Sequence, residues 1–517
     1  MAAAFLQSHG IDVDAEMQRI QFGQDGRQNS TESPSTGRRV KSVINASLPG
    51  TPPGSLWDVH LDPSSGCISF IHPSSTRSDR EDCSTSTPGN NSSGVVIDAQ
   101  HALLTPSLCH PHIHLDKAYL LSHPKYSHLL MERGGFAEAM ELTGKAKAQF
   151  THQDLLERGQ RLIDESAAAS VTHMRAFIEL DAGVGKKCLD AGLELKRKAK
   201  REGRCRMQIC AFAQLPLFTA SQDDPDGAVI RGLMEEAAVA EEVEALGSTP
   251  YVEADREKME RNVSWLVDLA IKHNKHLDFH LDYNLNAETE PLIWHVISVL
   301  KVKEWTTSNP DRTIVLGHCT RLTLFSAPEW QRLASLIRDS GLPVSFVGLP
   351  TSDLFILHQT LDIPRLIKEY GLNACIGVNN IGNAFTPHGS CDPLTLACQG
   401  MGVYQAGTER DAELLFECVS TRAREAIGFG RRRVGKGGFS GEAAGKGGEK
   451  AEDSGGNTDV ERAEEKTKER ESEEAADVDA DVGLQLREGD PATLLLFGHE
   501  KDAWRTRKTV AEAVYLG

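Results

Sequence analysis

The sequence lacks several features that mark other classes of protein. Its 517 residues contain no stretch of about 18 uncharged apolar residues, and no basic segment followed by an apolar one near the start, so neither a membrane span nor a secretory signal is indicated. The 11 cysteines are odd in number and have no repeated spacing, which favours free thiols in a reducing compartment. We therefore expect a cytoplasmic protein that does not enter a membrane.

Positive charge is also scarce. Lys and Arg total 56 against 74 Asp and Glu, and the net charge is −18. Proteins that bind nucleic acid carry clustered cations, so the expected partner is a small molecule rather than nucleic acid, and a homo-oligomer is compatible with the composition. The motifs HExxH, GxSxG and HxE with PCxxC are missing, which removes the signatures of zincin proteases, serine hydrolases and one class of zinc deaminases.

Three segments lack apolar periodicity, and they set the predicted domain boundaries. The first 40 residues and residues 74–94 are polar, and residues 442–481 carry 15 acidic and 6 basic side chains. Such compositions bury too little apolar surface to offset the entropy lost on ordering. We predict a disordered tail over 1–40, the first part of a small β domain over 41–100, a barrel over 101–430, a disordered acidic insertion over 431–483, and the second part of the β domain over 484–517.

What the sequence does contain is a series of eight short, β-rich hydrophobic runs. Near-continuous apolar runs are needed by strands that are covered on both faces. The intervals between them include helical patterns, such as the apolar stripe of Met259, Val263, Leu266, Val267 and Ala270. Alternating strands and helices favour an α/β fold with a parallel (β/α)8 TIM barrel. The runs begin at Leu103, Val171, Cys205, Glu241, His276, Arg312, Pro343 and Ala374.

Outside the barrel, further strands are expected near both ends of the chain. The segment VHLDPSSGCISFI, from Val59, has a strand-turn-strand pattern. After the acidic insertion, ATLLLF from Ala492 and EAVYLG at the end of the chain also have strand character. The two ends are therefore expected to share the small β domain.

Polar side chains with ligand chemistry follow several of the predicted barrel strands. His112 and His114 are two residues apart at the end of the first run, so both imidazoles can project to the same side and bind one ion. Barrel enzymes place their active sites at the carboxyl ends of the strands. The fifth, sixth and eighth runs also finish in such residues, namely His280, His318, Asn379 and Asn380. We predict a site for a single metal ion.

Six segments resemble, in order, the cytosine deaminase-like branch of the amidohydrolase superfamily, which includes the N-isopropylammelide amidohydrolases. They are LLTPSLCHPHIHLDKA, MQICAFAQ, FHLD, VLGHCT, VSFVGLPTSDLF and IGVNNIGNAFTPHGSCDPL, and the resemblance covers residues 42–428 and 484–517. It implies a distorted (β/α)8 barrel with a β-sandwich built from both termini, and one zinc or iron ion held by His112, His114 and His280. It also implies that Gln214 binds the substrate ring and that His318 polarises the substrate and steadies the hydroxide that the ion activates.

Two positions depart from that branch. The aspartate of its eighth strand aligns with Asn379, which we keep among the metal-binding residues although, as an amide, it cannot act as a base. A glutamate three residues after the strand-5 histidine aligns with Tyr283, which argues against cytosine as the substrate. We place Tyr283 and Asn380 with Gln214 among the substrate-binding residues.

The sequence offers candidates for the missing carboxylate and for a cationic group in the site. Asp282 and Asp116 could supply the carboxylate, although a helix-capping or supporting role is an equal alternative for each. Lys117 could donate to a developing anion, or it could be a solvated lysine at the barrel rim. Asp353 is expected to shape the pocket rather than to bind metal.

These residues predict a hydrolase that cleaves a C–N bond in a small nitrogen heterocycle such as a cyclic amidine. The assigned catalytic residues are His318, Asp282 and Lys117, and the leaving group is ammonia or an alkylamine. The alternative is a barrel that has lost catalysis and acts as a binding or scaffold protein, because Asn379 and Tyr283 replace acid and base residues of the branch.

Overall fold

The computed structural model describes residues 39–74, 94–220, 224–430, 483–498 and 506–516. The predicted disordered tail and the predicted acidic insertion lie almost entirely outside these residues, as does the polar segment after Ser74. Among the described residues, none of the helices is long and apolar enough to cross a membrane.

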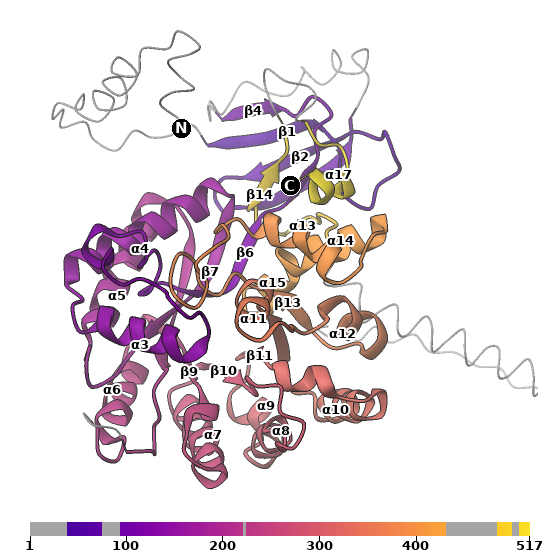
Figure 1. Ribbon diagram of the computed structural model, residues 1–517. Helices are drawn as coiled ribbons and strands as arrows, with labels where there is room; N and C mark the ends of the chain where they lie inside the picture. Colours follow the sequence, from indigo (N-terminus) through magenta and orange to yellow (C-terminus); the bar gives the residue numbers. More distant parts are fainter. Residues whose placement is uncertain (1–38, 75–93, 221–223, 431–482, 499–505, 517) are drawn as a thin grey trace, which may run out of the picture.

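The centre of the molecule is an eight-stranded parallel sheet in which neighbours in the sequence are neighbours in space (Figure 1). The closing contact is an isolated parallel bridge between Ile113 and Asn379, where the amide of Asn379 donates to the carbonyl of His112 and the amide of His114 donates to the carbonyl of Asn379. The predicted barrel is confirmed. Its strands are β6 (Leu108–His114), β7 (Val171–Glu179), β8 (Arg206–Ala213), β9 (Val243–Ser248), β10 (His276–Leu281), β11 (Ile314–His318), β12 (Val344–Gly348) and β13 (Ala374–Ile376).

Helices surround the barrel and fill the connections between its strands (Figure 1). The predicted stripe on α7 (Arg256–Lys272) is present, with Val263, Leu266, Val267 and Ala270 buried. The other helices of this layer are α3 (Phe136–Lys147), α4 (His152–Ala168), α5 (Lys187–Glu202), α6 (Ala228–Val239), α8 (Ile293–Val302), α9 (Trp305–Ser308), α10 (Ala327–Ser340), α11 (Pro350–Leu357), α12 (Ile363–Tyr370), α13 (Pro393–Val403), α14 (Glu409–Cys418) and α15 (Thr421–Ala426). Short 3-10 turns are η2 (Pro124–Tyr126), η3 (Pro250–Val252) and η4 (Thr320–Leu324).

A smaller β structure, built from both ends of the described chain, lies against one end of the barrel (Figure 1). One sheet has the order β3-β2-β1-β4, and a second pairs β5 with β14 in antiparallel register. Apolar side chains from both ends share one core, including Val59 and Ile68 from the first part and Leu486 and Leu494 from the last. The strands are β1 (Val40–Ala46), β2 (Trp57–Asp62), β3 (Cys67–Pro73), β4 (Val95–Asp98), β5 (Leu104–Pro106) and β14 (Leu494–Leu496).

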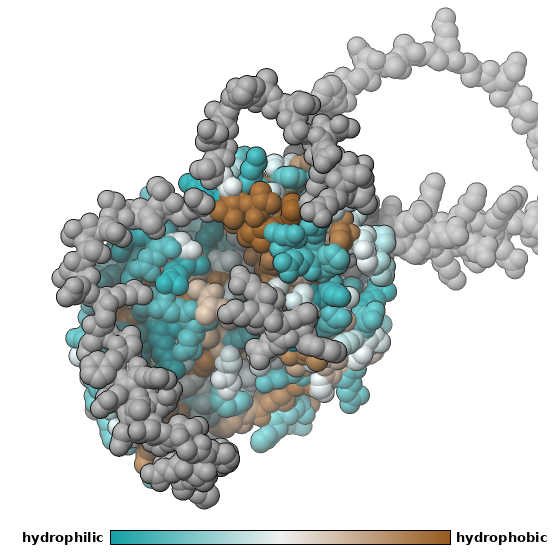
Figure 2. Space-filling model, turned by 90° about the horizontal axis from the view of Figure 1, so that it is seen from above, coloured by the Kyte–Doolittle hydropathy of each residue, from teal (hydrophilic) through white to brown (hydrophobic). Residues whose placement is uncertain are grey.

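From above, hydrophobic surface shows over this smaller β structure, among hydrophilic residues (Figure 2). Its outer strands β3 and β4 each leave one large apolar side chain about half exposed, Phe70 and Val96.

Two sequence expectations about these elements are wrong. The first predicted run is split, because Leu104–Pro106 pairs with β14 and only the segment from Leu108 enters the barrel. The terminal EAVYLG segment is not a strand but part of α17 (Val510–Leu516), which packs on α13 and α14. Val510, Ala511, Ala513 and Val514 are buried, and this helical spacing lets a short apolar segment cover those helices.

Candidate metal centre and active site

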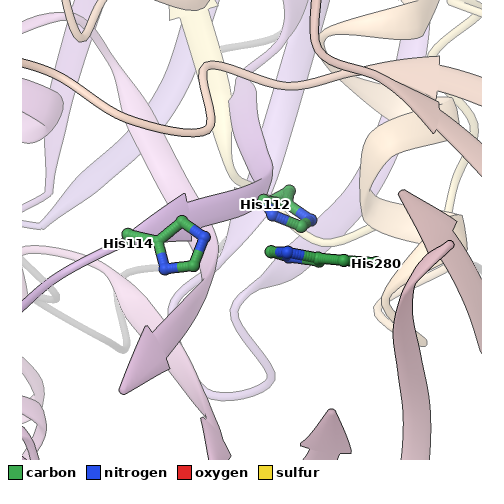
Figure 3. Close-up of side chains that lie close together, drawn as sticks. All are labelled: His112, His114 and His280. Atoms are coloured by element: carbon green, nitrogen blue, oxygen red, sulfur yellow. The ribbon is translucent and has the colours of Figure 1, made fainter. Parts of the chain in front are cut away.

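Three histidines converge at the carboxyl ends of two barrel strands. His112 and His114 come from β6 and His280 comes from β10, and each offers a ring nitrogen within 4.8 Å of the others. Figure 3 shows the three rings turned toward a common point. The rings of His112 and His280 are nearly stacked, with centroids 4.6 Å apart.

The nitrogens of these rings fit a bound cation. Both nitrogens of His112, Nδ1 of His114 and Nε2 of His280 are buried without any hydrogen-bond partner, an arrangement that is costly for a polar group unless something binds it. Burial, and after it repulsion from neighbouring cationic side chains, holds the pKa of all three imidazoles well below the usual value. A neutral imidazole is the form that binds a metal, so the residues present suit a divalent ion.

Asn379 lies beside this cluster with its amide held in one orientation. Its Nδ2 donates to Ser352 Oγ at 2.8 Å, and its Oδ1 is buried without a partner. The backbone of Asn379 has a φ of 65°, a left-handed conformation that asparagine tolerates better than most residues. An amide oxygen directed away from Ser352 can serve as a neutral ligand or hold a water, but not as a base.

His318 forms a buried pair with Asp353. Its Nδ1 lies 2.6 Å from Asp353 Oδ1, and Asp353 is 0% exposed. The other carboxylate oxygen accepts from Thr360 Oγ1 at 3.0 Å and from the Leu349 amide at 3.3 Å. Burial raises the pKa of Asp353, and the neighbouring His318 opposes that shift. With Nδ1 bound to Asp353, the remaining Nε2 of His318 is left to act on a substrate.

Lys117 lies inside the site rather than at a solvated rim. It is 2% exposed, its ammonium pairs with Glu179 and it donates to Gln214 Oε1 at 3.3 Å. Glu179 also accepts from Lys147 at 2.5 Å. His114, Asp116 and Glu179 also offer ligand atoms within 4.8 Å of one another, but Lys117 and Lys147 already pair with Glu179.

Most of the predicted site residues line one cavity. Its volume is about 20 Å³, and its walls come from the ends of β6, β8, β10, β11 and β13. Eight of the ten predicted residues lie on it: His114, Lys117, Gln214, His280, Tyr283, His318, Asn379 and Asn380. His112 stands behind them in the histidine cluster.

Two solved structures share this architecture over nearly the whole chain. The 5-methylcytosine deaminase of Klebsiella pneumoniae has a TM-score of 0.66 at 20% identity, covering 92% of this chain and 93% of that chain. The protein has the fold of the cytosine deaminase-like amidohydrolases. The N-isopropylammelide isopropylaminohydrolase of Burkholderia multivorans has a TM-score of 0.63 at 18% identity, and the match covers 92% of this chain and 95% of that chain. No protein-family model and no curated protein matches the sequence.

Within this amidohydrolase fold, the two candidate carboxylates near the histidines accept hydrogen bonds from backbone amides, although Asp116 also has a carboxylate oxygen within 4.8 Å of a ring nitrogen of His114. Asp282 accepts from the backbone amides of Leu292 and Ile293 at 2.7 and 3.1 Å, which are the amides at the start of α8. One oxygen of Asp116 accepts from the Glu179 amide at 2.7 Å. Neither residue lines the cavity. This geometry favours the capping and supporting alternatives, and the catalytic assignment of Asp282 is not carried further.

Several residues in and around the cavity had no assigned role in the sequence analysis. Tyr251, Phe136 and Phe385 line the cavity, and Tyr283 lies with its ring 4.3 Å from that of His318. Beneath the histidines, Asp278 Oδ1 is 4.0 Å from His112 Nδ1, and its other oxygen accepts from Arg175 at 2.8 Å. Asp278 is two residues before His280, so the two-residue period of a strand could have found it. The aromatic lining comes from connecting segments, which have no such signal.

Proposed function

We propose that the protein is a hydrolase that uses one divalent metal ion, zinc or iron, to cleave a C–N bond of a small nitrogen heterocycle. The observation that carries this proposal is the convergence of three buried histidines with unpartnered ring nitrogens. They lie beside a cavity that is also lined by His318, whose Nδ1 pairs with Asp353. The two similar structures are named as enzymes that act on 5-methylcytosine and on N-isopropylammelide, which supports a heterocycle as the substrate.

His112, His114 and His280 would hold the ion, with Asn379 Oδ1 beside them. An ion bound there supplies Lewis acidity and lowers the pKa of water toward neutrality. His318 Nε2 takes the proton from the attacking water, whose oxygen forms a bond to the ring carbon. The same proton then passes to the leaving nitrogen, the C–N bond breaks, and ammonia or an amine departs. The remaining hydroxyl proton moves to the adjacent ring nitrogen, which leaves a carbonyl on the ring.

Asp353 makes His318 suited to this proton transfer. Because its carboxylate accepts from Nδ1, it fixes the tautomer and stabilises the imidazolium that forms when Nε2 is protonated. This pair supplies the carboxylate that Asn379 lacks, so the residue that receives the proton is His318 and the residue that positions it is Asp353.

The other wall of the cavity binds the ring. Tyr283, Phe136 and Phe385 line this wall, and the ring centroid of Phe136 lies 5.8 Å from each of the other two in edge-to-face geometry. Lys117 and Gln214 present donors at the edge of the cavity. These donors suit acceptor atoms on the far edge of a planar heterocycle.

The experiment is a screen of the metal-loaded protein against pyrimidines, triazines and hydantoin-like rings, with ammonia and amine measured separately. We expect release from at least one ring, and a loss of more than 100-fold in His280→Ala. The matched control is His152→Ala, since His152 is an exposed histidine on α4, and it should turn over substrate like the wild type. No release from any ring by metal-loaded protein would contradict the proposal.

A binding protein without catalysis is the second candidate, and Asn379 is the observation that favours it. Asn379→Asp separates the two. An enzyme adapted to asparagine loses rate when the amide becomes a carboxylate, whereas a barrel that had lost catalysis through this residue gains metal affinity and turnover.

A further inference from the structure

A second and larger cleft adjoins the candidate catalytic cavity. Its volume is about 390 Å³, against about 20 Å³ over the histidines, which is little more than the roughly 10–15 Å³ that one water occupies. Lys117, Gln214 and Phe385 line both spaces. We call the larger space the side cleft. A molecule bound over the histidines with its far edge against Lys117 and Gln214 therefore has room beyond that edge.

The walls of the side cleft are mainly apolar. They come from α3 and α6, which lie next to each other on one side of the barrel (Figure 1), and from the segments after β7 and β8. Apolar side chains on these walls include Met140, Leu215 and Ile230. Gly144, on α3, also lines the cleft and is exposed, so the cleft reaches the surface there.

The charged groups on the walls already have partners within the protein. Glu179 pairs with Lys117 and Lys147, and Asp181 pairs with Lys147. Asp224 accepts from the amides of Val229 and Ile230 at the start of α6. An ionic group entering the cleft would lose its hydration without finding an unpaired counter-charge, which is costly.

One polar group on the walls is left over. Thr143, on α3, is buried, and its Oγ1 has no hydrogen-bond partner. Thr143 lines both the side cleft and a smaller neighbouring cavity. Its hydroxyl can both donate and accept, so when it is turned toward the side cleft it suits a hydroxyl, ether or carbonyl oxygen on a bound molecule.

We propose that the side cleft binds an uncharged, mainly aliphatic substituent of the heterocycle, carried on the ring edge opposite the scissile C–N bond and bearing one oxygen that reaches Thr143. This assignment rests on the proposed function, because it places the ring between Lys117, Gln214 and the histidines. The substrate is then a substituted heterocycle rather than a bare ring, and the side cleft determines that specificity.

Gly144→Leu tests the proposal by filling the cleft. A Cβ added at Gly144 meets no atom within 4 Å, and leucine is a better helix former than glycine, so the variant should fold. The matched control is Gly232→Leu in α6, where an added Cβ also meets nothing within 4 Å and the residue does not line the cleft. The substrates are a triazinediamine and an aminopyrimidinone, each bare or carrying a butyl, 4-hydroxybutyl, 4-aminobutyl or 3-carboxypropyl group.

We expect kcat/KM for the hydroxybutyl compound to exceed that of the bare ring by at least tenfold, and the two ionic compounds to fall below the butyl compound. Gly144→Leu should lower kcat/KM for the butyl and hydroxybutyl compounds by at least tenfold while the bare ring stays within twofold. Gly232→Leu should change neither. Thr143→Val should remove the advantage of hydroxybutyl over butyl and leave the butyl compound unaffected.

Three results would overturn the side-cleft assignment while leaving the hydrolase intact. The first is an equal kcat/KM for bare and substituted rings, and the second is a higher kcat/KM for an ionic substituent. The third is an equal loss of kcat/KM for all rings in Gly144→Leu, because the cleft would then be an entry path. If no ring is turned over, the proposed function fails instead. In that case, calorimetry measures the affinity of the bare and hydroxybutyl rings for the wild type and for Gly144→Leu. The side-cleft assignment predicts that the wild type binds the hydroxybutyl ring more tightly than the bare ring and that Gly144→Leu loses this preference. Equal affinities for the two rings in the wild type reject the assignment.

Discussion

Replacing Asp353 by asparagine should remove most of the catalytic rate while leaving the site assembled. The side chain keeps its size, and an amide oxygen can still accept from His318 Nδ1, whose distance to the present carboxylate is 2.6 Å. What disappears is the negative charge next to the imidazolium. We therefore expect a fall in kcat with little change in KM.

The expected size follows from the burial of both partners. Asp353 is fully buried and His318 is 5% exposed. Two unit charges about 4 Å apart interact by about 4 kcal/mol at an effective dielectric constant of about 20. A loss of about 4 kcal/mol in the transition state is about a 10³-fold loss of rate, which lies within the range of about 10² to 10⁴ typical of general acid–base catalysis.

The assay is steady-state release of ammonia or amine at several substrate concentrations, with metal content measured on the same samples. Thr360→Val is the matched control, because it removes a hydrogen bond to the same carboxylate but keeps the charge, and about 0.5–1.5 kcal/mol, or roughly a 3- to 10-fold loss, is expected. A fully metallated Asp353→Asn protein with kcat within threefold of wild type would refute the assigned role of this pair.

Further predictions concern capping and pH. Asp282→Asn should lower the free energy of unfolding by about 1–3 kcal/mol, because one of the two buried amides of α8 loses its acceptor. The kcat per bound metal ion should stay within twofold of the wild type. A 100-fold loss of kcat at wild-type stability would instead restore the catalytic assignment of Asp282. Burial, followed by the charges of Arg424 and Arg206, lowers the pKa of His173 to about 3. Below about pH 6.5 the unfolded chain therefore binds a proton at His173 that the folded chain does not bind. The contribution of His173 to the free energy of unfolding is full above that pH and declines below it, by about 2 kcal/mol between pH 6.5 and 5. His173→Gln should flatten that decline in urea unfolding measured across this range, and an unchanged slope would exclude His173 as its source.

The histidine cluster was predictable because its signal is local. His112 and His114 alternate along one strand, and His280 and His318 end other runs of the same barrel, so strand geometry alone brings them to one end. The barrel itself was predictable for a related reason, since its eight buried strands need near-continuous apolar runs.

The features that the sequence analysis missed depend on contacts between distant segments. His318 ends β11 and Asp353 lies in α11, 35 residues further along the chain, and no spacing predicts their 2.6 Å contact. Lys117 was left open between rim and site because its burial depends on Glu179, 62 residues away along the chain, and on the aromatic lining. Asp282 shares the strand period of His280, but the strand ends at Leu281 and a φ of 48° turns Asp282 toward α8.

The terminal helix α17 shows a similar limit. The segment is short, and its apolar side chains are at positions 510, 511, 513 and 514. This pattern fits a short strand and a helical turn about equally well. The contacts with α13 and α14 decide for the helix, and they are not visible in the sequence.

The central claim is that His112, His114 and His280 bind one divalent metal ion. The most direct measurement is the metal content of the purified wild-type chain and of His114→Ala and His280→Ala, by elemental analysis after expression with zinc or with iron. The account predicts about one ion per wild-type chain and less than a tenth of that in either variant, with all three proteins folded. A folded wild-type chain that retains no zinc, iron or manganese, or variants that retain the full amount, would contradict it.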